Sequence, residues 1–175
     1  MLKTIAMIAT AMIATILIYA ATKPDTFHVQ RSTHIAAPAE KVFGLISDLH
    51  QWAAWSPWEK MDPAMKKTYS GAPQGTGAAL EWDGNDDVGT GRMEIVSAVP
   101  SSRVVFKLDF LKPFEAHNQA EFTLEGGGTA TTVTWAMHGP QPFMMKVMDI
   151  VMNMDKMVGK DFETGLANLK QLAEQ

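Results

Sequence analysis

The chain has 175 residues, of which 46% are hydrophobic and 19% are charged, and its formal net charge at pH 7 is −4. All 19 acidic residues lie after residue 21, so the folded part is acidic and lacks the basic face that a nucleic-acid partner needs. The absence of cysteine excludes disulfide bonds, a thiol nucleophile and thiolate-bound metals.

The first segment, residues 4–21, contains no charged residue and lies between Lys3 and Lys23. A helix of about 18 apolar residues just suffices to cross the hydrocarbon layer of a membrane, which is roughly 30 Å thick. We therefore predict a membrane-anchoring helix over residues 4–21 that is hydrophobic on all sides and detached from the rest of the chain.

A cleaved signal peptide is the alternative interpretation of this segment. The apolar region of a signal peptide is about 7–15 residues long and is followed by a small-x-small cleavage site. Cleavage after Ala20 or Ala21 would place Ile18 or Tyr19 where a small residue is expected, so an uncleaved anchor is favoured.

The chain thus divides into an anchor or signal peptide (1–22), a linker (23–26) and one domain (27–175), which is long enough for a sizeable core. Lys3 and the free amino terminus precede the apolar segment, which favours a cytoplasmic N-terminus and a domain outside the cytoplasm. A cleaved chain would instead be secreted or periplasmic.

At the start of the domain, residues 27–35 alternate in polarity with a period of two, which predicts a first strand. Pro38 suits the first position of a helix, and the apolar spacing after it predicts a short helix that ends near Ser47. Asp48 is expected to cap a second short helix, which Pro57 ends.

After Pro63 the pattern changes to short alternating segments separated by turn residues, which predicts six further strands. They are expected at Lys66–Tyr69, Ala78–Trp82, Gly91–Val99, Arg103–Phe110, Ala116–Glu125 and Thr129–Met137. Because the connections are short, the seven strands should form one curved antiparallel sheet. Residues 141–174 carry apolar residues at intervals of three and four, which predicts a long amphipathic C-terminal helix, interrupted near Met154–Gly159.

Residues 35–58 combine a strand end, a proline-started helix and three closely spaced tryptophans. The relevant positions are Ile35, Ala37, Pro38, Glu40, Val42, Phe43, Ile46, Asp48, Trp52, Trp55, Pro57 and Trp58. With the tail MDKMVGKDFETGLANLK, they resemble the polyketide cyclase/dehydrase branch of the START-like (SRPBCC) superfamily. The resemblance implies an α+β helix-grip fold, in which a curved sheet holds the C-terminal helix around an apolar pocket.

Strand parity predicts which side chains face the helix. The inward sets are Leu80 and Trp82; Met93 and Ile95; Val104, Phe106, Leu108 and Phe110; Ala120, Phe122 and Leu124; and Val133, Trp135 and Met137. Asn118 is the clearest polar residue with inward parity. It is either a ligand contact or a core amide with a protein partner.

We predict that an apolar ligand contacts eight residues with inward parity or near the expected pocket. They are Trp55, Trp58, Trp82, Phe106, Asn118, Trp135, Met144 and Met148. Trp52, Trp55 and Trp58 would form a rigid rim over the pocket, and the methionines of the C-terminal helical segment would form a pliable gate. The alternative is that the tryptophans cap the core and the methionines fill it.

Catalytic patterns are sparse. The sequence contains no HExxH zinc motif and no Gly-x-Ser-x-Gly nucleophile motif, and no metal or cofactor is predicted. Glu59, directly after the tryptophans, is the candidate for a general acid, because aromatic surroundings would disfavour its charged form. The alternative is a solvated side chain in a loop.

These observations favour a membrane-tethered domain that binds a hydrophobic small molecule or lipid. One alternative is a cyclase/dehydrase-like enzyme that acts on an apolar substrate. Another is a protein-interaction module of the cell envelope, which would present the tryptophans or the methionine-rich segment as an exposed patch.

Overall fold

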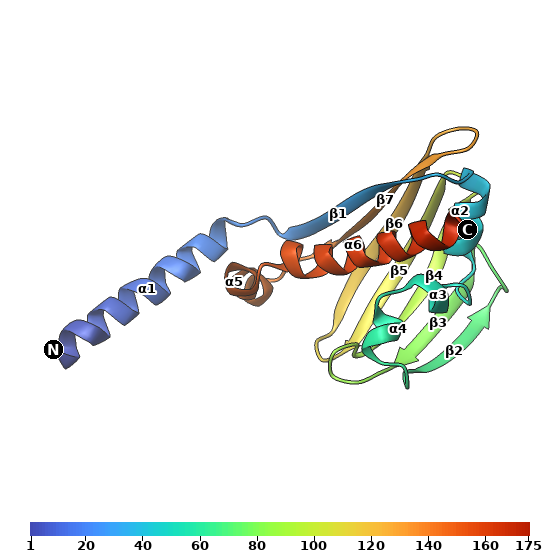
Figure 1. The fold of residues 1–175 in the computed structure, drawn as a ribbon. Coiled ribbons are helices and arrows are strands. Elements are labelled where there is room, and N and C mark those ends of the chain that lie inside the picture. Colours follow the sequence, from blue (N-terminus) through green and yellow to red (C-terminus); the bar gives the residue numbers. More distant parts are fainter.

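The computed structural model describes all 175 residues and shows a curved antiparallel sheet of seven strands that holds a long C-terminal helix (Figure 1). The strands are β1 (Thr26–Ile35), β2 (Lys66–Gly71), β3 (Ala78–Asp83), β4 (Thr90–Val99), β5 (Arg103–Lys112), β6 (Ala116–Glu125) and β7 (Thr131–Pro140). The helices are α1 (Leu2–Thr22), α2 (Ala39–Ser47), α3 (Trp52–Trp55), α4 (Trp58–Met61), α5 (Phe143–Met152) and α6 (Met154–Ala173). The predicted α+β helix-grip fold is therefore confirmed.

The sheet order is β1-β7-β6-β5-β4-β3-β2. Strands β2 to β7 follow each other as hairpins, and β1 pairs antiparallel with β7, so the first and last strands lie side by side. A register shift between Ile95 and Ser97 marks an irregularity in β4, and such bulges increase strand bend and twist. The result is a concave face that α6 crosses.

The register also defines two ends of this face. One end contains the start of β1, the end of β7, the start of β6 and the end of β5. We call it the α1 end, because α1 leads directly into β1. The opposite end, next to α2, is called the α2 end.

Three helices, not the two predicted, connect β1 to β2. Pro57 was expected to end the helix that contains Trp52 and Trp55, and that helix does end before it. However, Pro57 has φ −65° and ψ −30°, which suits the start of another helix, and α4 follows directly. Asp48 accepts a hydrogen bond from the backbone N–H of His50 (2.9 Å) in the turn before α3, so it does not cap that helix as predicted.

Strand β7 differs most from its predicted range, because it begins at Thr131 instead of Thr129 and extends to Pro140. Gly126 and Gly128 have positive φ angles of 143° and 80°, so the β6–β7 turn is made by glycines that tolerate this conformation, and it occupies the residues before Thr131.

The C-terminal helical segment is divided at Asn153, one residue before the predicted interruption. Asn153 has a left-handed φ of 52°, which asparagine tolerates better than most residues. Its side chain accepts a hydrogen bond from the N–H of Lys156, and Asp149 accepts one from the N–H of Met154 (2.7 Å). These bonds fix the start of α6 and let α5 take a different direction.

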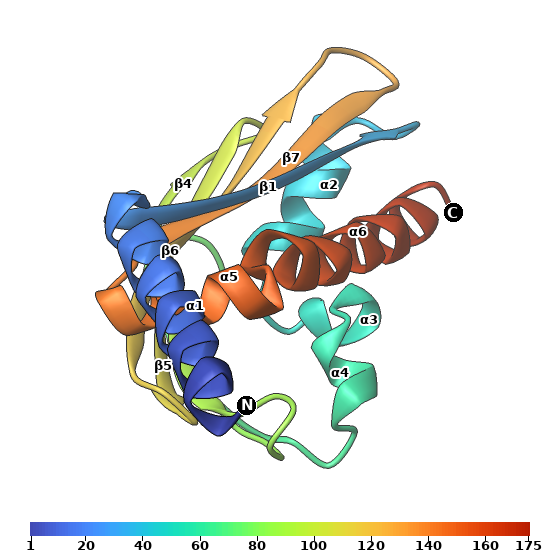
Figure 2. The same ribbon diagram turned by 90° about the vertical axis from the view of Figure 1, so that its left-hand side faces the viewer.

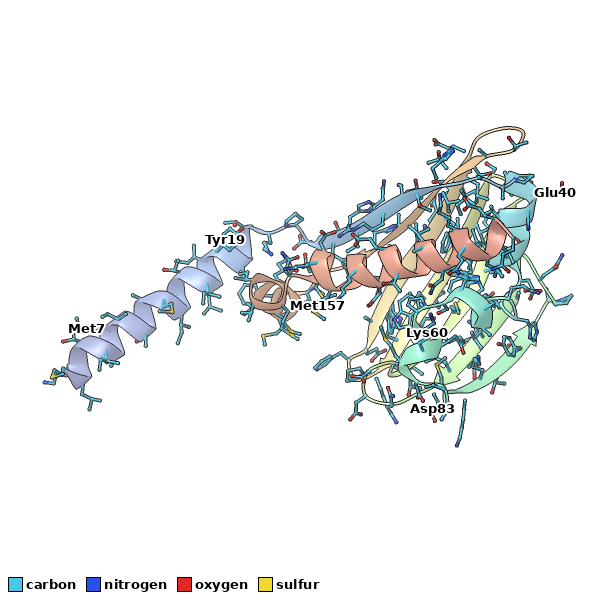
Figure 3. The ribbon with its side chains drawn as sticks, in the orientation of Figure 1. Met7, Tyr19, Glu40, Lys60, Asp83 and Met157 are labelled. Atoms are coloured by element: carbon cyan, nitrogen blue, oxygen red, sulfur yellow. The ribbon has the colours of Figure 1, made fainter.

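Helix α1 projects away from the domain, and Figure 3 shows its side chains, including Met7 and Tyr19, surrounding it without contact to the sheet. It is 21 residues long, about 31 Å at 1.5 Å per residue, with a mean hydropathy of 2.1 over its most apolar window. Such a helix fits a membrane anchor or a signal sequence. Its last turn is not detached as predicted, because Ala20 is fully buried where α1 meets α5.

Candidate functional site

The α2 end of the concave face is filled by aromatic rings. Trp135 stacks on Phe162 of α6 with ring centroids 4.1 Å apart and planes inclined by 7°. On its other side Trp135 stacks on Phe122 (4.7 Å), and Trp52 and Trp55 contact these rings edge-on. All five rings are buried, so this part of the face is a packed core.

The indole N–H groups in this core differ in their hydrogen bonding. Trp52 donates to the carbonyl of Ile46 (2.9 Å) and Trp55 to that of Leu45 (3.1 Å), which ties α3 to α2. The buried Trp135 Nε1 has no partner. Gly165 of α6 gives this ring its space, since a Cβ atom there would lie 2.8 Å from Trp135 Cζ3.

In β5 and β6, the concave face becomes more exposed toward the α1 end. In β5 the inward side chains of Val104 and Phe106 are buried, whereas Leu108 and Phe110 are only half-buried. In β6 the same change occurs between the buried Ala120 and the half-buried Asn118. The apolar interior is therefore partly open along β5 and β6, at the end of the sheet that faces α1 and α5.

Trp82 forms a rigid wall at this open end. Its ring contacts Phe110 edge-on at 5.7 Å and lies against Gly91, where a Cβ atom would be 2.4 Å from the ring. Its Nε1 donates a long hydrogen bond to the carbonyl of Val88 (3.4 Å). Glycine at position 91 is thus needed for this ring position.

Asn118 places an unpaired polar atom at the same end. Its Oδ1 is enclosed and has no hydrogen-bond partner. It lies against Gly139 of β7, where a Cβ atom would be 2.1 Å away. A buried acceptor without a donor costs about 1–3 kcal/mol. Asn118 is therefore not the core amide with a protein partner that was the alternative prediction.

The eight predicted binding residues fall into three groups. Trp55, Phe106 and Trp135 lie inside the packed core, with exposed fractions of 2% or less. Trp82 and Asn118 share the open end, and Trp58, half-buried, contacts Trp135 edge-on at 5.7 Å. Met144 and Met148 lie outside the core, because α5 exposes them to solvent.

Glu59, the candidate acid, is half-buried on α4 and not in a solvated loop. Both of its carboxylate oxygens accept hydrogen bonds from Lys67 Nζ of β2, at 2.8 and 2.7 Å. This salt bridge links α4 to the edge of the sheet.

Asp161 is an acidic residue that the sequence analysis missed. It is half-buried on α6, and burial raises the pKa of its carboxyl group. Asp161 lies one turn before Gly165, which faces Pro57 and Trp135, so the two residues share a helix face. The sequence could have indicated this position, because Asp161 is three residues after Val158 and four before Gly165, which places all three on one face of the helix.

Two surface depressions lie away from the open α1 end of the concave face. The first, of about 210 Å³, is lined by residues that include Leu49, Pro73 and the stacked pair His50 and Tyr69, whose rings are 3.9 Å apart. The second, of about 230 Å³, lies between α3 and the end of α6. Both are smaller than typical ligand pockets of about 300–1,000 Å³, and neither contains a predicted binding residue.

The model of one protein family, described as "Polyketide cyclase / dehydrase and lipid transport", matches residues 26–174. The chain belongs to this family. The match covers the whole sheet and α2 to α6 but not α1, so the resemblance seen in the sequence is confirmed. No curated protein matches the chain.

Solved structures share the family fold at low sequence identity. The Zhui aromatase/cyclase from Streptomyces sp. R1128 is 16% identical with a TM-score of 0.60, over 85% of this chain and 94% of that one. The di-domain aromatase/cyclase StfQ from the steffimycin biosynthetic pathway is 12% identical with a TM-score of 0.62, over 85% and 51%. The Aha1 dimer from Colwellia psychrerythraea is 16% identical with a TM-score of 0.57, over 85% and 96%. At these identities the similarity establishes the fold alone.

Proposed function

We propose that this member of the family is a membrane-tethered domain that binds a hydrophobic small molecule or lipid at the open α1 end of its concave face. One observation carries the proposal. Along β5, inward apolar side chains change from buried to half-buried, from Val104 and Phe106 to Leu108 and Phe110. Covering this apolar surface with a ligand would be favourable by about 25 cal/mol per Å².

The polar groups of the open end suit such a ligand. Binding sites for small molecules are mostly apolar and contain a few polar groups that fix orientation. Asn118 would have this role, because its enclosed Oδ1 would accept a hydrogen bond from a ligand hydroxyl or amide. Trp82 and Trp58 would contact the ligand directly, while Trp55, Phe106 and Trp135 would form the rigid base.

Helix α1 supports the proposed tether, because its length and composition suit a membrane span. Lys3 on its N-terminal side favours a domain outside the cytoplasm. The ligand site would then remain beside the bilayer, from which an apolar molecule is drawn.

The test is native mass spectrometry of the full-length protein, extracted from its own membranes. We expect a co-purifying apolar molecule, and we expect Phe110→Ala to lose most of it. Leu111→Ala is the matched control, because Leu111 is the next residue of β5 and its side chain is 56% exposed to solvent. Equal retention in both variants would contradict the proposed position of the site.

A catalytic role is a second candidate, and Asp161 is the observation that favours it. A carboxyl group with a raised pKa on the inner side of α6 is a chemically reasonable proton donor for a cyclase or dehydrase reaction. Glu59 is less suitable, because Lys67 occupies both of its oxygens. If the protein is an enzyme, Asp161→Asn should abolish turnover and leave ligand retention intact.

A further inference from the structure

Helix α5 has an inverted distribution of polarity. Its exposed side chains are apolar: Phe143 (46%), Met144 (68%), Met148 (39%), Val151 (78%) and Met152 (49%). At 100° per residue these five positions occupy one continuous half of the helix surface. A helix that packs on a protein core has the opposite arrangement, with its apolar side buried.

The only two charged residues of α5 face the protein. Lys146 is 6% exposed, and its Nζ donates to the Asp25 carboxylate (2.6 Å) and to the carbonyl of Lys23 (2.9 Å). Asp149 accepts a hydrogen bond from Lys23 Nζ (2.5 Å). The linker after α1 is therefore clamped to the charged side of α5, and the free side carries no charge.

Helix α5 lies next to the end of α1, the candidate membrane anchor. The helix contacts the last turn of α1 around the buried Ala20, and it crosses the end of α1 instead of continuing along it (Figures 1 and 2). If α1 spans the bilayer, α5 lies at the level where the hydrocarbon layer ends. A helix with one apolar face is stable in this layer, parallel to the membrane plane, with that face about 5–10 Å deep.

A second exposed apolar group lies at the same end of the sheet. Phe114, at the β5–β6 turn, is 66% exposed, and the register places this turn at the α1 end. Met157, labelled in Figure 3, adds a further exposed side chain (46%) just after α5. The apolar exposure of the domain thus accumulates on the side that faces the membrane anchor.

We propose that the apolar face of α5 is an interfacial membrane helix, which rests on the lipid surface and holds the open end of the concave face against it. This inference rests on the proposed tether and adds an orientation to it. An apolar ligand would then pass between bilayer and site without crossing water. Met144 and Met148 would contact lipid and not the bound ligand.

The experiment uses the full chain, which has no native cysteine, so single cysteines can be labelled cleanly. Nitroxides are placed at Val151 on α5, at Ile13 on α1 and at Thr76 in the β2–β3 turn, all of them exposed positions. The protein is reconstituted in vesicles of phosphatidylcholine and phosphatidylglycerol. Collision rates of each label with oxygen, which concentrates in lipid, and with a water-soluble nickel chelate are measured by electron paramagnetic resonance.

We expect the oxygen-to-nickel ratio at Val151 to approach that at Ile13 and to be several times that at Thr76. A lipid-like ratio at Ile13 with a water-like ratio at Val151 would overturn the interfacial helix and leave the tether intact. A water-like ratio at Ile13 would overturn the tether and the inference with it. Shielding of Val151 from both reagents, with dipolar coupling between labels, would show that a second copy covers α5 and would also overturn it.

Discussion

The two ends of the concave face are formed by the same strands but are covered to different extents. At the α2 end, Trp135 lies between Phe162 and Phe122 and is 2% exposed. At the α1 end, Leu108 and Phe110 of strand β5 keep part of their surface exposed. Under the proposed function, stability and ligand contact are assigned to opposite ends of one sheet, so variants at the two ends should separate these properties.

The largest expected effect is at the filled end. Trp135→Ala should lower the free energy of unfolding by about 3–5 kcal/mol, because it removes a fully buried ring from a close-packed cluster. Trp58→Ala is the matched control, since this tryptophan is half-buried at the edge of the same cluster and should cost clearly less. Urea denaturation followed by circular dichroism measures both. Equal losses would contradict the distinction between core and rim.

Substitution of one glycine at each end by alanine tests the difference in packing between the two ends. Gly165→Ala should cost about 1–3 kcal/mol of stability, because the new Cβ would meet Trp135 and Pro57 in a region without space. Gly139→Ala at the open end should cost less, since the atom it meets is the end of the Asn118 side chain. It should instead reduce ligand retention by displacing that amide. A stable Gly165→Ala protein with unchanged unfolding would argue against tight packing there.

Strand parity predicted the inward residues correctly because the period of two is a property of the local backbone. The buried state of Leu80, Met93, Ile95, Val133 and Met137 confirms it. The contrast between the two ends could not be predicted in this way, since Phe106 and Phe110 have the same parity. Their difference depends on where α6 and the tryptophan helices lie over the sheet.

The separate orientation of α5 was also beyond the sequence pattern. The apolar period over residues 141–174 predicts one long helix, interrupted near Met154–Gly159, with one buried side. The left-handed Asn153 turns α5 away, and the contacts of Lys146 and Asp149 with the linker reverse its buried side. These contacts join residues more than 120 positions apart, and no local pattern encodes them.

A smaller effect on folding stability is expected from substitution of Asp161. Burial raises the pKa of its carboxyl group above the ordinary 3.8, so its contribution favours the folded state below that pH and is lost as the pH rises through the folded-state pKa. At neutral pH the ionised group is therefore destabilising. Asp161→Asn should increase the urea midpoint at pH 7, and the gain should shrink as the pH approaches 3.8. A midpoint that falls at pH 7 would contradict this.

The smallest effect is expected on the outer face of the sheet. The Asp109 carboxylate, 2.7 Å from His117 Nδ1, raises the pKa of His117 through a hydrogen bond. This interaction contributes stability below the ordinary pKa of about 6.5, and the contribution disappears as the pH rises through the higher folded-state value. In the unmodified protein, the urea midpoint should fall slightly as the pH rises above about 6.5. His117→Gln should remove this fall and leave ligand retention unchanged. A change in retention would mean that the two faces of the sheet are coupled.

The most direct test of the central claim is photo-crosslinking from inside the proposed site. A photoreactive phenylalanine analogue is placed at Phe110, and in a second protein at Tyr69, which is also half-buried and aromatic but lines the depression beside His50. Each protein is expressed in cells, extracted, washed free of loose lipid and irradiated, and its intact mass is measured. We predict a discrete mass increase from an apolar adduct at Phe110 and none at Tyr69. An adduct at Tyr69 alone, or at neither position, would contradict a ligand site at the open end of the concave face.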